Sequence, residues 1–153
     1  MGTSSHPPSG LPHGWRALRL GEIARVYPGG RLGLTKTDDY VESGVPAFSA
    51  AGQDGNVAVE EFQEPGVVLS SIGARCGKTF LAGSSWTTLA NTQAIIPDPN
   101  QADHRYIWQV TNDESFWVRS GTAQPFIKPR DVKGAWLALP PLPEQRKIAA
   151  ILS

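Results

Sequence analysis

Glycine and proline interrupt this sequence so often that only short helices and strands can form. The 153 residues contain 16 glycines and 13 prolines, which are spread along the whole chain. Glycine favours turns, and proline can neither continue a helix nor donate a hydrogen bond within a sheet. The length suffices for one compact domain with a hydrophobic core but not for two. We therefore predict a single α+β domain, with a small twisted β-sheet and short flanking helices.

Apolar runs bounded by turn residues predict the strands. Strands are expected at 45–51, 67–72, 79–81, 87–89, 91–97 and 135–139. The polar segment 35–44 predicts a loop. The Gln-Asp-Gly-Asn sequence at 53–56 predicts a hairpin turn, because Asp-Gly and Gly-Asn pairs favour the backbone conformations of tight turns.

The strongest internal helical pattern covers residues 103–111, where three apolar residues share one face and Asp103 suits the helix start. A second pattern covers 143–152, with a proline in the first turn and Glu144 near the positive end of the helix dipole. Shorter helical segments are expected at 20–26 and 114–119, and a turn or single 3-10 turn at 128–131.

Residues 1–12 are rich in Ser, Pro, Gly and His, so we expect a flexible leader and no signal peptide. No apolar run approaches the roughly 20 residues that a membrane span needs. The only cysteine, Cys76, excludes an intrachain disulfide, and one cysteine with three histidines lacks the spacing of zinc sites. We expect a cytoplasmic protein that binds no metal and no cofactor.

Charge is balanced overall but unevenly distributed. The 14 basic and 14 acidic residues give a net charge of zero, and this counts against nucleic-acid binding, where a basic excess is usual. However, 37–64 holds seven acids and no base, whereas 71–97 and 115–130 hold bases and no acid. The folded chain could show a modestly basic face opposite an acidic one, or the mixture could serve only solubility.

A Gly-Lys-Thr sequence at 77–79 resembles part of a phosphate-binding P-loop but fails on spacing. A P-loop has four residues between its first glycine and the Gly-Lys pair, and here three residues separate Gly73 from Gly77. No helix is expected to follow and hold the phosphate at its N-terminus. The segment is predicted as two strands joined by a basic turn. Arg75 and Lys78 project from this turn, either to contact a phosphate or the edge of a base, or into solvent.

Nucleophilic catalysis also lacks sequence support. Cys76 lies beside two cations that could lower its pKa. However, His6 and His13 fall in the leader and His104 falls at a helix start, so no histidine is placed to act as its base. No Gly-x-Ser-x-Gly motif occurs either. We predict that the chain is not an enzyme.

Several segments, in order, resemble the target-recognition domain of type I restriction-modification specificity subunits. The most specific is the C-terminal junction at 139–152, where a strand is followed by Pro-Pro-Leu-Pro-Glu-Gln and the start of a helix. The N-terminal match consists of Leu-Pro-His-Gly-Trp at 11–15 and Leu-Gly-Glu-Ile-Ala at 20–24. The remaining matches are the apolar run 66–73, Asn-Thr-Gln at 91–93 and Gly-Thr-Ala-Gln-Pro-Phe-Ile at 121–127.

This resemblance implies non-catalytic recognition of double-stranded DNA. A full specificity subunit carries two such domains, each recognising half of an interrupted site. It docks modification subunits that methylate adenine, and a restriction subunit with motor and nuclease activity. The implied boundaries here are 13–141 for the target-recognition domain and 142–153 for the start of a coiled-coil-like spacer helix. A single domain is compatible with a fragment, a natural half-subunit or a module of another phage-defence system.

The turns supply the side chains that we expect to contact DNA. Arginine and lysine suit guanine or phosphate, whereas asparagine and glutamine suit adenine. The candidates are Lys36, Arg75, Lys78, Asn91, Gln93, Thr122, Gln124 and Lys128.

The C-terminal helix carries a separate prediction. Ile148, Ile151 and Leu152 form an apolar stripe, which we expect to mediate homodimerisation or subunit docking. The alternative is that the stripe packs back on its own domain.

A second hypothesis for the function rests on the acidic segment 37–64. In this hypothesis the chain is a protein-interaction regulator or DNA mimic that occupies a partner's DNA channel. The acids of the segment are Asp38, Asp39, Glu42, Asp54, Glu60, Glu61 and Glu64.

Overall fold

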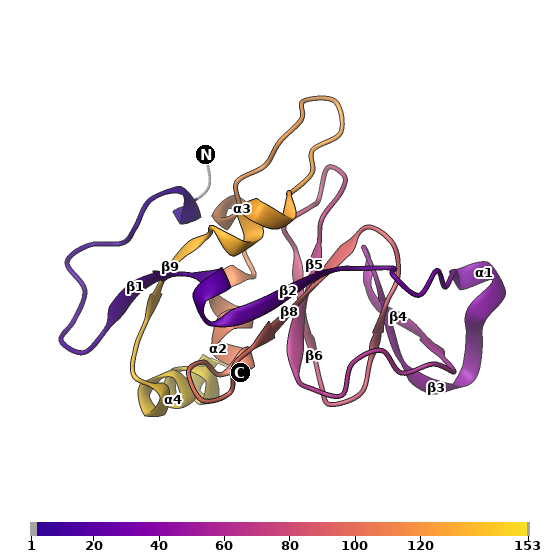
Figure 1. Cartoon of the computed structure of the whole chain (residues 1–153), viewed down its shortest axis with the longest axis horizontal. Coiled ribbons are helices and arrows are strands. Elements are labelled where there is room, and N and C mark those ends of the chain that lie inside the picture. Colours follow the sequence, from indigo (N-terminus) through magenta and orange to yellow (C-terminus); the bar gives the residue numbers. More distant parts are fainter. Residues whose placement is uncertain (1–2, 153) are drawn as a thin grey trace.

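The computed structural model describes residues 3–152, with the side chains of residues 4–151. Three small sheets follow one another along the long axis of the molecule (Figure 1). At one end β1 (Arg16–Arg19) pairs with β9 (Trp136–Leu139). The central sheet has the order β2 (Ala24–Pro28), β8 (Thr92–Pro97), β5 (Gly66–Ser70) and β6 (Thr79–Ala82). The far sheet has the order β4 (Gly52–Val57), β3 (Tyr40–Ser49) and β7 (Thr87–Thr88).

The two inner strands of the central sheet, β5 and β8, are buried along their whole length. Alternate side chains of a strand face opposite sides of its sheet. Val67, Leu69 and Ile95 therefore belong to one core cluster, which includes residues of β1 and β9. Val68 and Ala94 belong to a second cluster on the other face. Burial on both faces explains why each strand contains an uninterrupted apolar run, at 67–69 in β5 and 94–97 in β8.

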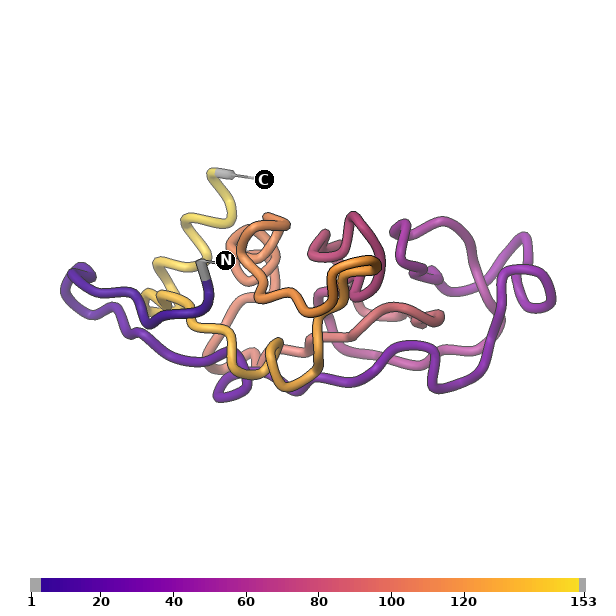
Figure 2. Tube along the Cα trace, turned by 90° about the horizontal axis from the view of Figure 1, so that it is seen from above, coloured from indigo at the N-terminus to yellow at the C-terminus, as the bar shows by residue number. Residues whose placement is uncertain are grey.

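Two helices lie on the same side of the sheets, as the view in Figure 2 shows. The first, α2 (His104–Thr111), packs on β5 and β6 and against the second, α4 (Leu142–Leu152). Asp103 caps α2 by accepting a hydrogen bond from the Arg105 amide at 2.8 Å. Tyr106 and Ile107 face the core.

The buried side chain of Gln145 joins α4 to the rest of the domain. Its amide nitrogen donates to the carbonyl oxygens of Gln101 at 3.0 Å and Pro140 at 2.9 Å. Its side-chain oxygen accepts from the Asp103 amide at 2.9 Å. The glutamine of the Pro-Glu-Gln sequence therefore satisfies backbone groups that would otherwise be buried without partners.

The remaining short elements connect these layers. They are η1 (Thr3–Ser5), η2 (Leu20–Glu22), α1 (Lys36–Asp39), η3 (Glu114–Phe116) and α3 (Pro129–Lys133). The predicted α+β class, the strands at β5 to β8 and at β9, and the two longer helices are confirmed. Within the predicted flexible leader 1–12, residues 3–5 form a 3-10 turn and Ser4 is buried.

Two sequence predictions near the N-terminus are wrong. The helix expected at 20–26 is a single 3-10 turn followed by β2, because residues 24–28 form an edge strand along β8. The loop expected at 35–44 contains α1 and the first half of β3. Thr35 caps α1 by accepting a hydrogen bond from the Asp38 amide at 3.2 Å.

Three turn and helix assignments also differ from the sequence predictions. The 53–56 segment lies inside β4, and the chain reverses one step earlier, between the paired residues Ser49 and Gly52. The helix expected at 114–119 is the three-residue 3-10 turn η3. The turn expected at 128–131 is the α-helix α3, which Pro129 begins because proline fits the first turn of a helix.

No helix within residues 3–152 is long and apolar enough to span a membrane.

Candidate nucleic-acid interface

Connecting segments from distant parts of the sequence gather along one edge of the molecule, at the top of Figure 1. Hydrogen bonds tie them together. The Ser71 amide donates to the Asn91 carbonyl at 3.0 Å, and the Gly73 amide donates to the Pro125 carbonyl at 2.8 Å. We call this surface the loop edge; it consists of residues 34–36, 49–51, 71–78, 89–91 and 120–128. Seven of the eight candidate DNA contacts lie on it.

A pair of glycines allows the chain to pass close to the turn before β8. A Cβ atom on Gly29 would lie 1.9 Å from the Thr92 hydroxyl oxygen, and one on Gly30 would lie 2.8 Å from the Ala90 backbone. Gly30 also has a φ of +74°, a conformation that side chains disfavour. The two glycines therefore let the chain cross the 89–92 turn and bring the following loop, with Lys36, next to Asn91.

Lys36 and Asn91 line one cavity of about 370 Å³ at the loop edge. Its walls are segments 34–36, 49–51 and 89–91. Asn91 has a φ of +68° and is the one non-glycine residue with positive φ among the residues that the structure describes. Asparagine tolerates this left-handed conformation better than most residues. The turn exposes Asn91 next to the buried strand β8.

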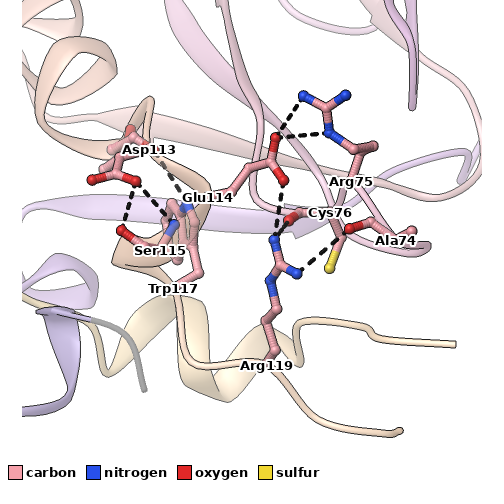
Figure 3. Close-up of polar contacts among 9 residues, drawn as sticks. Ala74, Arg75, Cys76, Asp113, Glu114, Ser115, Trp117 and Arg119 are labelled. Atoms are coloured by element: carbon pink, nitrogen blue, oxygen red, sulfur yellow. Dashed lines mark hydrogen bonds and ion pairs between the residues drawn. The ribbon is translucent and has the colours of Figure 1, made fainter. Parts of the chain in front are cut away.

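The basic turn between β5 and β6 forms as the sequence predicts, with the Gly77 amide donating to the Ser70 carbonyl at 2.8 Å. Arg75 projects from this turn and pairs with Glu114 of η3 at 3.0 Å (Figure 3). Arg119 donates to the Cys76 carbonyl at 2.6 Å and also pairs with Glu114, at 3.3 Å. These contacts hold the basic turn against the segment that follows α2.

The lysine of the basic turn, unlike the arginine, has no acidic partner among the described residues. Lys78 is exposed, and it forms no ion pair or hydrogen bond through its side chain within residues 3–152. Its backbone carbonyl accepts from the Ser70 amide at 2.9 Å, which fixes the lysine at the end of the turn. Lys78 is therefore available to bind an anion.

A narrow hairpin supplies three further candidates. The backbones of Ser120 and Phe126 exchange hydrogen bonds of 2.8 Å and 2.9 Å. Thr122 and Gln124 are exposed between them. Lys128 follows the hairpin and is the N-cap residue of α3. Its side chain is half-buried.

Gln93 lies outside this surface. Its side chain is buried in β8 and donates to the Ile127 carbonyl at 2.8 Å. It therefore joins β8 to the segment after the hairpin, and in this conformation it cannot reach DNA.

Sequence reasoning missed the acidic partners of the basic side chains. Asp54 pairs with Lys36 at 2.5 Å, and Glu114 pairs with two arginines. Burial opposes ionisation of Asp54, but hydrogen bonds from Lys36, Tyr40 and Ser49 outweigh it and hold the pKa of Asp54 below its usual value. Lys36 and Asp54 are 18 residues apart in sequence, and Arg75 and Glu114 are 39 apart, so no local pattern marks these pairs.

The acidic segment 37–64 is partly neutralised by bases from the N-terminal part of the chain. Glu64 pairs with Arg25 at 2.5 Å, and Glu61 pairs with Arg31 at 2.7 Å. With the pair formed by Asp54, three of the seven acids are compensated within the domain. The segment therefore presents less negative charge than its sequence indicates.

The residues considered for catalysis are not arranged for it. Cys76 is fully buried, and this burial raises the pKa of its thiol despite the opposing effect of Arg119. His104 lies at the start of α2, where burial lowers its pKa. Within residues 3–152, no group of three or more His, Cys, Asp or Glu side chains could hold a metal ion.

The predicted apolar stripe of α4 is divided between core and solvent. Ile148 is half-buried and packs against the first core cluster. Ile151 has 79% of its surface exposed. The side chain of Leu152 lies outside the described residues.

The comparisons with known proteins agree on one family. Residues 12–153 match the model of the type I restriction modification DNA specificity domain. No curated protein is significantly similar in sequence.

Three solved structures share the fold. The HsdS subunit from Thermoanaerobacter tengcongensis is 25% identical, with a TM-score of 0.66 over 97% of this chain and 39% of that one. A chain from a study of complex assembly and conformational transition in the type I R-M system is 24% identical, with a TM-score of 0.72 over 96% and 39% of the two chains. The type I S subunit from M. genitalium is 16% identical, with a TM-score of 0.71 over 95% and 40%.

The chain thus spans about two fifths of the length of the solved proteins that it matches. The family model nevertheless covers nearly all of it, including all but the first residue of the segments whose order suggested the resemblance. The chain belongs to the type I restriction-modification DNA specificity domain family.

Proposed function

We propose that this chain is a DNA sequence-recognition module, which directs an adenine methyltransferase of a type I restriction-modification or related defence complex to its site. The match of residues 12–153 to the DNA specificity domain carries the proposal. In this function the domain binds and orients DNA and catalyses no reaction.

The loop edge supports this role through its chemistry. It combines exposed lysine, arginine, asparagine, threonine and glutamine side chains on turns that are tied together by backbone hydrogen bonds. Recognition of base edges requires such groups on a rigid scaffold, because only groups held in place can distinguish one base pair from another. The near-neutral net charge fits a module that shares its contacts to phosphate with partner subunits.

The partners follow from the family resemblance. It implies that two recognition domains read a complete interrupted site, and residues 12–153 match one DNA specificity domain. We propose that a second copy or a longer subunit supplies the second recognition domain, and that modification and restriction subunits assemble on the complex in the cytoplasm.

The exposed end of α4 is the surface that we assign to this assembly. Ile151 is the better position for a test substitution, because it is exposed whereas Ile148 packs against the core. Ile151→Asp should lower the mass measured by light scattering, or weaken capture of the modification subunit, and leave the melting temperature unchanged. Unchanged mass and unchanged capture would contradict the assignment.

Equilibrium binding to a labelled random-sequence duplex tests the DNA function. Each lysine that contacts a phosphate adds about 0.9 to the slope of log affinity against log salt. The double variant Lys78→Ala/Lys128→Ala should therefore bind more weakly and show a slope that is smaller by about 1.8.

The matched control is Arg16→Ala/Lys147→Ala, which removes the same charge from β1 and α4, away from the loop edge. We expect the control to retain most of the affinity and slope of the wild type. Equal losses in the two double variants would show that binding follows overall charge and would contradict recognition through the loop edge.

A further inference from the structure

The cavity between segments 34–36, 49–51 and 89–91 contains a lysine whose charge is already compensated. Lys36 Nζ lies 2.5 Å from Asp54 Oδ2. The same oxygen accepts from the Ser49 hydroxyl at 2.7 Å, and Asp54 Oδ1 accepts from the Tyr40 hydroxyl at 2.5 Å. Asp54 therefore holds three donors, one from α1 and two from the ends of β3.

This network fixes the direction of the lysine. Three elements meet at Asp54: α1 begins at Lys36, β3 carries Tyr40 and Ser49, and Asp54 itself lies in β4. Burial and the Asp54 contact raise the pKa of Tyr40, so its hydroxyl remains a donor to the carboxylate. A lysine on a flexible stem is normally free to sample many orientations, and the ion pair restricts it to the wall of the cavity.

Compensation also restricts what the lysine can bind. A phosphate that approached Lys36 would meet the Asp54 carboxylate close behind it, and the two negative charges would repel each other. A neutral hydrogen-bond acceptor would not be repelled. The ammonium group has three donors, and among the described residues only Asp54 takes one of them.

Lys78 offers the contrast within the same loop edge. Its side chain forms no ion pair among the described residues, so its full charge is available to a phosphate. Lys36 and Lys78 are therefore suited to different parts of a DNA duplex.

From these observations we infer that the cavity takes the edge of a guanine base. Lys36 donates to the guanine O6 and N7 atoms, and Asp54 acts as the positioning residue that suppresses phosphate binding. Guanine presents two adjacent acceptors in the major groove, which makes it the usual base partner of a lysine. The inference rests on the proposed DNA recognition and adds to it which lysine selects sequence and which binds the backbone.

The experiment combines sequence selection from random duplexes with salt titration, using the full chain and its variants. Lys36→Met should reduce the preference for guanine at one position by about tenfold and leave the salt slope unchanged. Lys78→Met should leave the selected sequence unchanged and reduce the slope by about 0.9. Asp54→Asn should weaken the guanine preference and steepen the slope, because Lys36 then becomes available to phosphate.

Two further measurements make the outcome independent of folding defects in the variants. Tyr40→Phe removes one donor to Asp54 but keeps the Lys36–Asp54 pair, so it should weaken the guanine preference less than Asp54→Asn does. A duplex with 7-deazaguanine at the selected position lacks the N7 acceptor, so the wild type should bind it more weakly and Lys36→Met should not distinguish it from guanine.

The possible failures are distinct. If the wild type selects no sequence and binds no DNA, the proposed function and the inference both fail. If the wild type selects a sequence but Lys36→Met retains it and loses slope as Lys78→Met does, Lys36 contacts phosphate. In that case only the inference is wrong.

Discussion

Glu61 and Arg31 form an ion pair of 2.7 Å in which the carboxylate is almost completely buried, with 1% of the Glu61 side chain exposed. The Thr88 amide and hydroxyl donate to the other carboxylate oxygen, at 2.8 Å and 2.7 Å. Arg31 also lies over the rings of Tyr27 and Phe62, at 4.8 Å and 5.1 Å. The Glu61–Arg31 ion pair therefore holds the loop that follows Gly29 and Gly30 against β7, just before Lys36.

Removing this carboxylate should destabilise the domain. Glu61→Ala leaves the Thr88 donors without a buried partner, and we expect a loss of about 3 kcal/mol in the free energy of unfolding. Urea denaturation measures the loss. The control is Glu60→Ala. Glu60 is exposed, and among the described residues its side chain interacts only with Gln63 and Ser85, so the change should affect the stability little. Equal stabilities of the two variants would show that the pair does not fasten the loop.

The thiol of Cys76 should be unreactive in the folded protein. The side chain is fully buried, and burial raises its pKa above the ordinary value. Since the thiolate is the reactive form, a disulfide reagent should modify native protein slowly and urea-unfolded protein rapidly. Absorbance of the released thiolate follows both reactions. Rapid modification without urea would restore Cys76 as a candidate nucleophile.

The stability of the domain should fall as the solution is acidified below neutral pH. Burial, with the neighbouring Arg105, lowers the pKa of His104 in the folded state despite the opposing effect of Asp103. The unfolded chain therefore binds a proton first, at about pH 6.5, and folding loses free energy as the pH falls from there through the folded-state pKa.

The variant His104→Gln isolates this effect because glutamine does not titrate. We expect its free energy of unfolding to depend less on pH than that of the wild type between about pH 7 and pH 5. Asp103 also has a lowered pKa, but its contribution is lost only at more acidic pH. Parallel pH profiles for the two proteins would show that His104 contributes nothing to the dependence.

Releasing Arg75 and Arg119 from Glu114 should strengthen binding to the DNA backbone. The neighbouring Arg75, followed by Arg119, holds the pKa of Glu114 below its usual value. The carboxylate is therefore ionised at neutral pH and offsets part of their charge. Glu114→Gln should raise the affinity for random-sequence duplex and steepen the salt slope by up to about 0.9. Glu144→Gln on α4 removes the same charge elsewhere, and an equal effect there would rule out a local role.

The sequence predicted the parts of the fold that local chemistry determines. Strands β5 and β8 each contain an uninterrupted apolar run bounded by turn residues, and α2 has a regular apolar face with Asp103 as its cap. The basic turn was predictable because glycines flank it on both sides. The segment at 20–26 was misjudged because its apolar spacing also suits an edge strand, and pairing with β8 decides between the two.

The site was predictable in its exposed turns but not in its pairings. Gln93 looked like a turn residue near Asn91, yet it is the second residue of β8 and its side chain is buried. The roles of Asp54 and Glu114 depend on contacts across 18 and 39 residues of sequence, which only the folded chain brings together. Arg119 appeared in the sequence only as one base of an acid-free segment.

Sequence selection from a pool of random duplexes, with the chain alone and with the modification subunit, tests recognition by this domain most directly. We expect the wild type to enrich one short motif, and Arg16→Ala/Lys147→Ala to enrich the same motif. A variant with alanine at Asn91, Thr122 and Gln124, three exposed loop-edge positions, should enrich a different motif or none while remaining folded. Failure of the wild type to enrich any motif, even with the modification subunit present, would contradict DNA sequence recognition by this chain.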